Sequence, residues 1–259
     1  MDKTEVKAWA KLNLILNVKG KRDDGYHEIE TVFQAISLCD IVTVERTEKK
    51  DEVRFLSTGK YVPCISNEEN LAYRALELAK KSFGRKECYL VSIEKNIPLA
   101  GGLAGGSADA AGVLTALSKL WELDELDEMY DIAAELGSDV AFCLASQNGH
   151  PCAIGRGRGE KMEFIEPVKG RLDLYFSDIH INSKTAAVYK SLIPDDYLVQ
   201  YDVTSFREAK TLEEKIRYMG NHLQPAFERL TGKSKDMLLC GAGPTYFKFS
   251  ENGEFETIV

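Results

Sequence analysis

The sequence lacks the features that would place it in several common classes of protein. None of its six cysteines belongs to a C-x-x-C pair, which disfavours a zinc ribbon or a thioredoxin-type redox site. No apolar run approaches the roughly 20 residues that span a membrane, and the first residues lead into no apolar signal segment. We therefore expect a cytoplasmic protein with reduced thiols and no membrane partner.

An excess of positive charge is also absent. The chain has 33 lysine and arginine residues against 41 aspartate and glutamate residues, for a net charge of −8 at pH 7. Because an acidic surface repels a phosphate backbone, we expect no nucleic-acid partner. The 259 residues, of which 44% are hydrophobic, suffice for one large domain or two lobes.

The hydrophobic periodicity predicts an α+β protein, because strands cluster before helices instead of alternating with them. We expect a first strand from Val6 to Lys19 that a turn interrupts at residues 10–13. The charged cluster at residues 48–52 is a hairpin tip or a solvated loop. A soft boundary near Gly149 divides an N-terminal lobe, residues 1–149, from a C-terminal lobe, residues 150–259. Further strands are expected over 31–36, 41–46, 90–93 and 172–176, and helices over 70–81, 107–121 and 126–136 and from Ser138 or Asp139.

The most informative stretch, PLAGGLAGGSADA at residues 98–110, carries four glycines within six residues. It follows a predicted strand and leads into a predicted helix, with Ser107 as the expected N-cap. Glycine lets the backbone approach a ligand closely, and free N–H groups at the start of a helix attract anions. This arrangement favours a phosphate-binding loop, with a glycine turn that holds no ligand as the alternative.

Two common phosphate motifs do not fit this stretch. Gly101 and Gly106 have the spacing of a P-loop, but Ser107 stands where that motif requires lysine. A dinucleotide fingerprint needs G-x-G-x-x-G, and no register of the stretch supplies it.

Four other segments hold residues suited to chemistry, and each has a structural alternative. Lys11 interrupts an apolar run and is suited to neutralising charge during phosphoryl transfer, or is a solvated surface group. Asp139 precedes an apolar run and is suited to accepting a proton, or is a helix N-cap. Tyr26 and His27 are suited to binding a nucleobase, or anchor a half-buried turn. The segment GAGPT at residues 241–245 is a close-approach glycine turn or a plain hairpin.

Three of these blocks, in this order, resemble the GHMP kinase superfamily. AKLN at residues 10–13 resembles its N-terminal motif, residues 98–110 its phosphate loop, and GAGPT its C-terminal motif. Within the superfamily, the likeness is greatest to the kinases of 4-diphosphocytidyl-2-C-methyl-D-erythritol. The segments that carry it are GYHEI at 25–29, TVFQ at 31–34, SDVAF at 138–142 and AIGRGRGE at 153–160, and the likeness runs from about Val6 to Phe249.

The resemblance implies a two-lobed fold of mixed sheets and helices, with nucleotide and substrate in the cleft between the lobes. It implies ATP-dependent phosphorylation of the 2-hydroxyl of 4-diphosphocytidyl-2-C-methyl-D-erythritol in non-mevalonate isoprenoid biosynthesis, with Mg²⁺ as a further cofactor. Asp139 is expected to take the proton from that hydroxyl, Lys11 to orient it and stabilise charge on the phosphoryl group, and Asn13 to line the same pocket.

The resemblance also implies the ligand-binding residues. Tyr26 and His27 are expected to bind the cytosine, with Tyr189 as a second stacking ring. The expected ATP-binding residues are Asn70, Lys95, Pro98, Leu99, Ala100, Gly101, Gly102, Leu103, Ala104, Gly105, Gly106, Ser107 and Ala108. No residue is assigned as the Mg²⁺ ligand, and no oligomeric state is assigned.

The loop departs from the pattern of many relatives, which carry glycine where this chain has Ala100 and Ala104. Alanine is tolerated there if φ stays negative. The alternatives in function are a sibling kinase for homoserine or mevalonate, a non-catalytic nucleotide-binding protein on the same fold, and a diphosphomevalonate decarboxylase. A sibling kinase has no need of a cytosine site at Tyr26 and His27, and a non-catalytic protein has no need of both Lys11 and Asp139.

Overall fold

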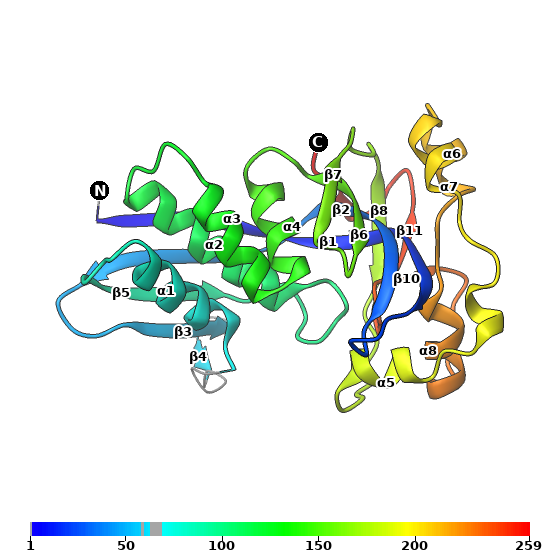
Figure 1. Ribbon diagram of the computed structural model, residues 1–259, viewed down its shortest axis with the longest axis horizontal. Coiled ribbons are helices and arrows are strands. Elements are labelled where there is room, and N and C mark those ends of the chain that lie inside the picture. The colour runs from blue at the N-terminus through cyan, green and yellow to red at the C-terminus, as the bar shows by residue number, and fades with distance from the viewer. Residues whose placement is uncertain (1, 58–59, 63–68) are drawn as a thin grey trace. The chain divides into compact units, whose positions relative to one another are not determined.

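The computed structural model describes residues 2–57, 60–62 and 69–259 (Figure 1). These residues form two compact units. Unit 1 comprises Met1–Ala10, Leu38–Leu99 and Ala104–Gly149, and unit 2 comprises Lys11–Ser37, Ala100–Leu103 and His150–Val259. Five cysteines are free thiols, and Cys64 lies outside the described residues. Each unit is made of three separate stretches of the chain. The division into an N-terminal and a C-terminal lobe at residue 149 stays a prediction.

Two long strands contribute residues to both units. β1 (Lys3–Lys21) is continuous, so the expected turn at residues 10–13 is wrong. The residues from Ala10 to Val18 are buried, and the polar side chains of Lys11 and Asn13 find hydrogen-bond partners inside the protein. β2 (His27–Thr47) is likewise one strand where two were expected.

In the sheet of unit 1, β2 and the next strand along the chain are separated by a strand that comes later in the sequence. β2 pairs antiparallel with β5 (Cys88–Glu94), and β5 pairs parallel with β3 (Glu52–Ser57), which in turn pairs with β4 (Lys60–Val62). Because β5 lies between β2 and β3, residues 48–51 join strands that are not neighbours. The cluster at residues 48–52 is therefore not a hairpin tip, and the exposed residues 48–50 match its alternative, a solvated loop.

Four helices of unit 1 pack together over its strands (Figure 1). They are α1 (Leu71–Ser82), α2 (Gly105–Leu120), α3 (Asp127–Leu136) and α4 (Ser138–Gln147), and α4 begins where the sequence predicts. α2 lies so close to the sheet at Gly112 that a Cβ atom there would be 2.8 Å from the Val42 side chain. This close packing holds the middle of α2 against the sheet.

Unit 2 contains a separate four-stranded sheet in the order β10 (Leu238–Leu239), β11 (Tyr246–Phe249), β8 (Arg171–Tyr175) and β12 (Phe255–Glu256). Its core joins β1 to α5 (Lys184–Lys190) and α8 (Leu223–Thr231) through buried residues that include Leu16, Val188 and Phe227. The remaining elements are β6 (Cys152–Gly157), β7 (Lys161–Phe164), η1 (Pro194–Tyr197), α6 (Val203–Glu208), α7 (Leu212–Ile216) and β9 (Gly220–Asn221). The mixed sheets and helices confirm the α+β class.

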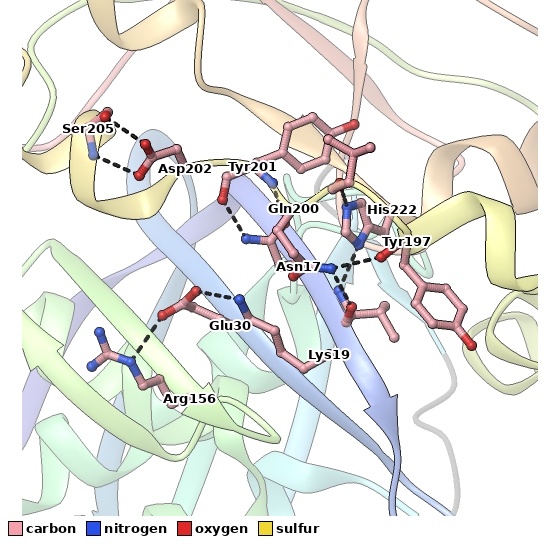
Figure 2. Close-up of polar contacts among 12 residues, drawn as sticks. Asn17, Lys19, Glu30, Arg156, Tyr197, Gln200, Tyr201, Asp202, Ser205 and His222 are labelled. Atoms are coloured by element: carbon pink, nitrogen blue, oxygen red, sulfur yellow. Dashed lines mark hydrogen bonds and ion pairs between the residues drawn. The ribbon is translucent and has the colours of Figure 1, made fainter.

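Polar contacts along β1 hold the segment around α6 in place (Figure 2). The Asn17 amide donates to the Tyr201 carbonyl at 2.8 Å and accepts from the Tyr201 N–H at 2.9 Å. The Val18 N–H donates to Nδ1 of His222 at 2.9 Å. Burial lowers the pKa of His222, so at neutral pH the ring is uncharged and accepts this bond. This histidine has a structural role.

The described helices include none that is both long and apolar enough to cross a membrane.

Candidate functional site

The part of the glycine-rich stretch in unit 1 forms the start of α2. Ala104 is the N-cap, with φ 59°, and the Ala108 N–H makes the first helical hydrogen bond to the Ala104 carbonyl at 2.8 Å. Ser107 is therefore the third residue inside the helix, and its expected role as N-cap is wrong. The left-handed conformation of Ala104 turns the chain, so the helix begins directly after it.

The first turn of α2 is open to a ligand. The N–H groups of Gly105, Gly106 and Ser107 precede the first helical donor, the Ala108 N–H, and the N-cap Ala104 makes no side-chain capping bond to them. A Cβ atom at Gly105 would be 3.0 Å from the Ile97 side chain, whereas one at Gly106 would meet no heavy atom within 4 Å. Free N–H groups beside open space are what an anion requires at the start of a helix.

Both alanines of the loop have positive φ, so the condition under which alanine is tolerated there, a negative φ, is not met. Ala100 has φ 55° and Ala104 has φ 59°. The left-handed conformation costs a residue with a Cβ atom about 1–2 kcal/mol. Such strain persists only where the surroundings hold the backbone, and it is concentrated at binding sites. The loop therefore keeps its shape through its contacts, without help from glycine at these two positions.

A buried ion triad supports the loop from within unit 1. Lys95 Nζ lies 2.6 Å from an oxygen of Asp109 and 2.5 Å from one of Asp40. The other oxygen of Asp40 accepts the backbone N–H groups of Asn96, at 2.5 Å, and Ile97, at 2.8 Å. The triad thus joins the end of β5 to β2 and to the first turns of α2.

The triad carries two carboxyl groups and one ammonium in a buried setting. Burial raises the pKa of Asp109 to about 8, against the opposing effect of Lys95. Burial lowers the pKa of Lys95, but Asp109 and Asp40 offset this and raise it overall. Within the described part of the chain, Oδ1 of Asp109 has no hydrogen-bond partner. A protonated Asp109 relieves the excess negative charge.

In unit 2, the middle of the glycine-rich stretch packs against the GAGPT turn. The Thr245 N–H donates to the Gly101 carbonyl at 3.3 Å. A Cβ atom at Gly102, where φ is 83°, would be 2.2 Å from the Cys240 carbonyl oxygen and 2.7 Å from that of Gly243. The turn joins β10 to β11, so it is at once a hairpin and a close-approach turn.

Lys11 lies beside the same segment of unit 2. Its N–H donates to the Leu103 carbonyl at 3.1 Å, and its Nζ donates to Oδ1 of Asn13 at 2.8 Å. Asn13 in turn donates to the Thr31 hydroxyl at 2.7 Å. The side chain of Lys11 is only 4% exposed, and Nζ is 5.1 Å from the centre of the Phe33 ring. Lys11 is therefore not a solvated surface group.

Lys184, at the start of α5, is a further residue at this place that the sequence analysis missed. Its Nζ donates to the carbonyl oxygens of Ala100 and Gly243. Burial, opposed in part by Cys240, lowers the pKa of Lys184 to about 8. No motif marks it, since it lies in an unremarkable segment far from both partners in sequence.

Two of the three residues expected to bind cytosine are in contact in unit 2. The rings of His27 and Tyr189 are stacked with their centres 5.0 Å apart. Tyr26 is 58% exposed, and the Arg158 guanidinium lies 4.9 Å from the centre of its ring. Burial is the largest cause of the lowered pKa of His27, so this imidazole is neutral at pH 7 and can both donate and accept.

Asn70 and Asp139 occupy the first turns of helices in unit 1. Asn70 is the N-cap of α1, and its side chain accepts the Ala72 N–H at 3.0 Å. Asp139 is half-buried and is the second residue of α4, whose N-cap is Gly137. Asp139 is therefore not the helix cap that was its structural alternative.

Unit 2 also contains a cavity of about 460 Å³, lined in part by Lys19, Glu30, Arg156 and Arg207. Lys19 pairs with Glu30 at 3.0 Å, and Arg156 pairs with Glu30 at 3.1 Å (Figure 2). Arg207 pairs with Glu163 at 2.5 Å. Because these charges neutralise one another, the cavity is a poorer candidate for an anionic ligand than the loop.

Comparison with known proteins identifies relatives over most of the chain. Residues 70–147 match the model of the GHMP kinases N terminal domain. A 4-diphosphocytidyl-2-C-methyl-D-erythritol kinase of Bacillus cereus (strain B4264) is 39% identical over 263 residues, which cover 93% of this chain and 86% of that protein.

Solved structures show the same likeness. A crystal structure of 4-(cytidine 5′-diphospho)-2C-methyl-D-erythritol kinase superposes with a TM-score of 0.77 and 30% identity, over 96% of this chain and 91% of that chain. Homoserine kinase from Cytophaga hutchinsonii superposes with a TM-score of 0.68 over 98% of this chain and 86% of that chain, but at 17% identity it shares the fold alone.

Proposed function

Since the chain belongs to the 4-diphosphocytidyl-2-C-methyl-D-erythritol kinase family, we propose that it transfers the γ-phosphate of ATP to the 2-hydroxyl of that substrate. The product then serves non-mevalonate isoprenoid biosynthesis. The chain is a kinase on a mixed α+β fold of the GHMP type. The roles of its individual residues are proposed below from their positions.

The start of α2 is proposed to bind the phosphates of ATP. The N–H groups of Gly105, Gly106 and Ser107 are available for charge-assisted hydrogen bonds to phosphate oxygens. Open space at Gly106 leaves room for the ligand. Asn70 and Lys95 are proposed to lie near the nucleotide, with Lys95 acting on the loop through its ion pairs with Asp40 and Asp109.

Lys11 is proposed to stabilise the negative charge that develops during phosphoryl transfer. Its ammonium is buried and held by Asn13, which reduces the reorganisation that the reaction requires. Asn13 is proposed to orient the acceptor hydroxyl together with Lys11. The hydrogen bond from Asn13 to Thr31 fixes its amide for that role.

Asp139 is proposed to accept the proton of the acceptor hydroxyl as the phosphoryl group is transferred. It lies on the first turn of α4, so its backbone is held by helical hydrogen bonds. A fixed carboxylate within reach of the hydroxyl makes proton transfer efficient. The proton moves from the hydroxyl oxygen to a carboxylate oxygen, and that hydroxyl oxygen forms a bond to the γ-phosphorus. The bond from the γ-phosphorus to the oxygen that bridges it to the β-phosphate breaks, and ADP leaves.

The choice of acceptor rests above all on the stacked rings of His27 and Tyr189. Tyr26 is proposed to stack on the cytosine, and the neutral His27 to hydrogen-bond it. Tyr189 supplies the second aromatic face. A kinase for homoserine or mevalonate has no base to bind and would not require this group of rings.

Mg²⁺ is proposed as the metal that accompanies ATP. The described residues include no cluster of three or more His, Cys, Asp or Glu side chains able to hold a metal. Mg²⁺ usually binds one or two protein groups together with substrate phosphates and water. Bound Mg²⁺ neutralises charge on the phosphates. Its protein ligand is unassigned, and location in the cytoplasm stays a prediction.

A coupled assay of ADP release tests the proposed function. The purified protein should turn over 4-diphosphocytidyl-2-C-methyl-D-erythritol in the presence of ATP and Mg²⁺, and should leave mevalonate and homoserine unreacted. Turnover of either of those two compounds without turnover of the cytidyl compound would refute the assignment. ATP binding without turnover of any of the three would favour a non-catalytic nucleotide-binding protein.

A further inference from the structure

Lys184 carries a positive charge in a place where the described residues supply no carboxylate partner. Its side chain is half-buried, and the groups that influence its charge are the thiol of Cys240 and the ammonium of Lys11. Both acceptors of its hydrogen bonds are neutral carbonyl oxygens. Among the described residues it forms no ion pair with a carboxylate. Burying part of a cation in such surroundings costs free energy unless an anion pairs with it.

The two carbonyl groups that Lys184 contacts indicate which anion this is. Ala100 belongs to the loop proposed to hold phosphates, and Gly243 belongs to the turn that packs against that loop. An ammonium has three N–H donors, so one remains after these two bonds. Lys11 and Lys184 therefore concentrate positive charge beside the segment from Ala100 to Leu103.

We propose that Lys184 is a phosphate-binding residue, whose third N–H donates to a phosphoryl oxygen of a bound nucleoside phosphate. The inference rests on the proposed function, which supplies two such ligands. One is ATP and the other is the cytidine diphosphate portion of the acceptor. In either case Lys184 contacts the loop backbone, the GAGPT turn and the ligand at once.

Binding measurements with Lys184→Met test this proposal. The variant keeps the length of the side chain and removes its charge. By calorimetry, the affinity for ADP or for CDP should fall at least about tenfold, which is the effect of losing one hydrogen bond to a charged group. The affinity for adenosine and for cytidine should not change, because neither has a phosphate. The nucleotide that is weakened identifies which ligand Lys184 contacts.

Two further variants serve as comparisons. Lys190→Met removes a charge from the exposed end of the same helix and should leave both nucleotide affinities unchanged. Lys184→Arg keeps the charge and should retain more of the affinity than Lys184→Met. The proposal is overturned if Lys184→Met binds both nucleotides as the unaltered protein does. It is also overturned if the nucleoside is lost to the same extent as its nucleotide, because Lys184 is then only a clamp between loop and turn.

A measurement on the unaltered protein covers the case in which Lys184→Met does not fold. The protein is labelled with ¹³Cε-lysine, and the NMR signal that is missing in Lys184→Arg is assigned to Lys184. The dependence of this signal on pH gives the pKa of the Lys184 ammonium directly. A bound phosphate should raise that pKa by about one unit or more, against the constant influence of Lys11 and Cys240. A pKa that neither nucleotide moves would refute the proposal. None of these measurements depends on turnover, so they remain decisive if the proposed acceptor is wrong.

Discussion

A single methyl group at Gly106 should make the protein more stable and its binding of ATP weaker. Gly106 is the second residue of α2, and a Cβ atom there would meet no heavy atom of the protein within 4 Å. The fold therefore tolerates alanine at this position. The same open space is where phosphate oxygens are proposed to approach the N–H groups of the helix start, and a methyl group would occupy part of it.

The two effects of Gly106→Ala can be given magnitudes. Replacing glycine by alanine in a helix stabilises it by up to about 1 kcal/mol, because the unfolded chain loses freedom and helix propensity rises. For a chain of this size, that corresponds to a rise in Tm of about 2–4 °C. Displacing a phosphate from one charge-assisted hydrogen bond costs about 1.5–3 kcal/mol, which weakens ATP binding roughly ten- to a hundredfold.

The assays are thermal unfolding and calorimetric titration with ATP, and Gly112→Ala is the matched control. Gly112 lies on the same helix, but a Cβ atom there would be 2.8 Å from Val42 and 3.3 Å from Ala8. This variant should lower Tm, since overpacking costs about 1–3 kcal/mol, and should leave ATP affinity unchanged. Unchanged affinity in Gly106→Ala would refute the placement of phosphate over Gly106. A lowered Tm in Gly106→Ala would refute the prediction that a methyl group fits at Gly106 without a clash.

Three further predictions concern other parts of the site. Asp139→Asn should reduce kcat at least about a hundredfold while ATP affinity stays the same, and an unchanged kcat would remove Asp139 as the base. Gly102→Ala should lower the urea midpoint, because φ is 83° and the Cβ atom would lie 2.2 Å from the Cys240 carbonyl oxygen; the left-handed conformation alone costs about 1–2 kcal/mol. A midpoint equal to that of the unaltered protein would contradict this packing. Burial raises the pKa of Asp109 from 3.8 to about 8, so between these pH values the folded state binds more protons at this group than the unfolded state does. Its contribution to stability is therefore complete below pH 3.8 and is lost as the pH rises to about 8. Asp109→Asn should flatten the dependence of unfolding free energy on pH over this range, and a slope that does not change would show that another group causes it.

The local pattern of residues predicted the helices and the order of the motifs well. α1 begins within one residue of its expected position, because its apolar residues recur with helical spacing. α4 begins at Ser138, one of its two expected first residues. The glycine-rich stretch was recognised as a strand-to-helix connection with a possible anion site. These features depend on residues close to one another in the chain, which the sequence displays directly.

Predictions failed where a distant contact determines the local conformation. A turn was expected at residues 10–13, within the first strand. Instead β1 continues, because the polar side chains have hydrogen-bond partners inside the protein. Asn13 donates to the Thr31 hydroxyl on the neighbouring strand and accepts from the Lys11 ammonium. Ser107 was expected to cap α2, but the positive φ of Ala104 starts the helix two residues earlier than Ser107.

The sequence was sufficient to indicate a phosphate-binding loop and the family of kinases, because the loop motif and its companions Lys11 and Asp139 can be recognised as short patterns of residue types. Only the folded chain brings Asp40 and Asp109 to Lys95, and Lys184 to the carbonyl groups of Ala100 and Gly243. These partners come from elements far apart in sequence, and no local periodicity records which side chains meet. The energy of a buried charge depends on the groups around it, so its role is decided by tertiary packing.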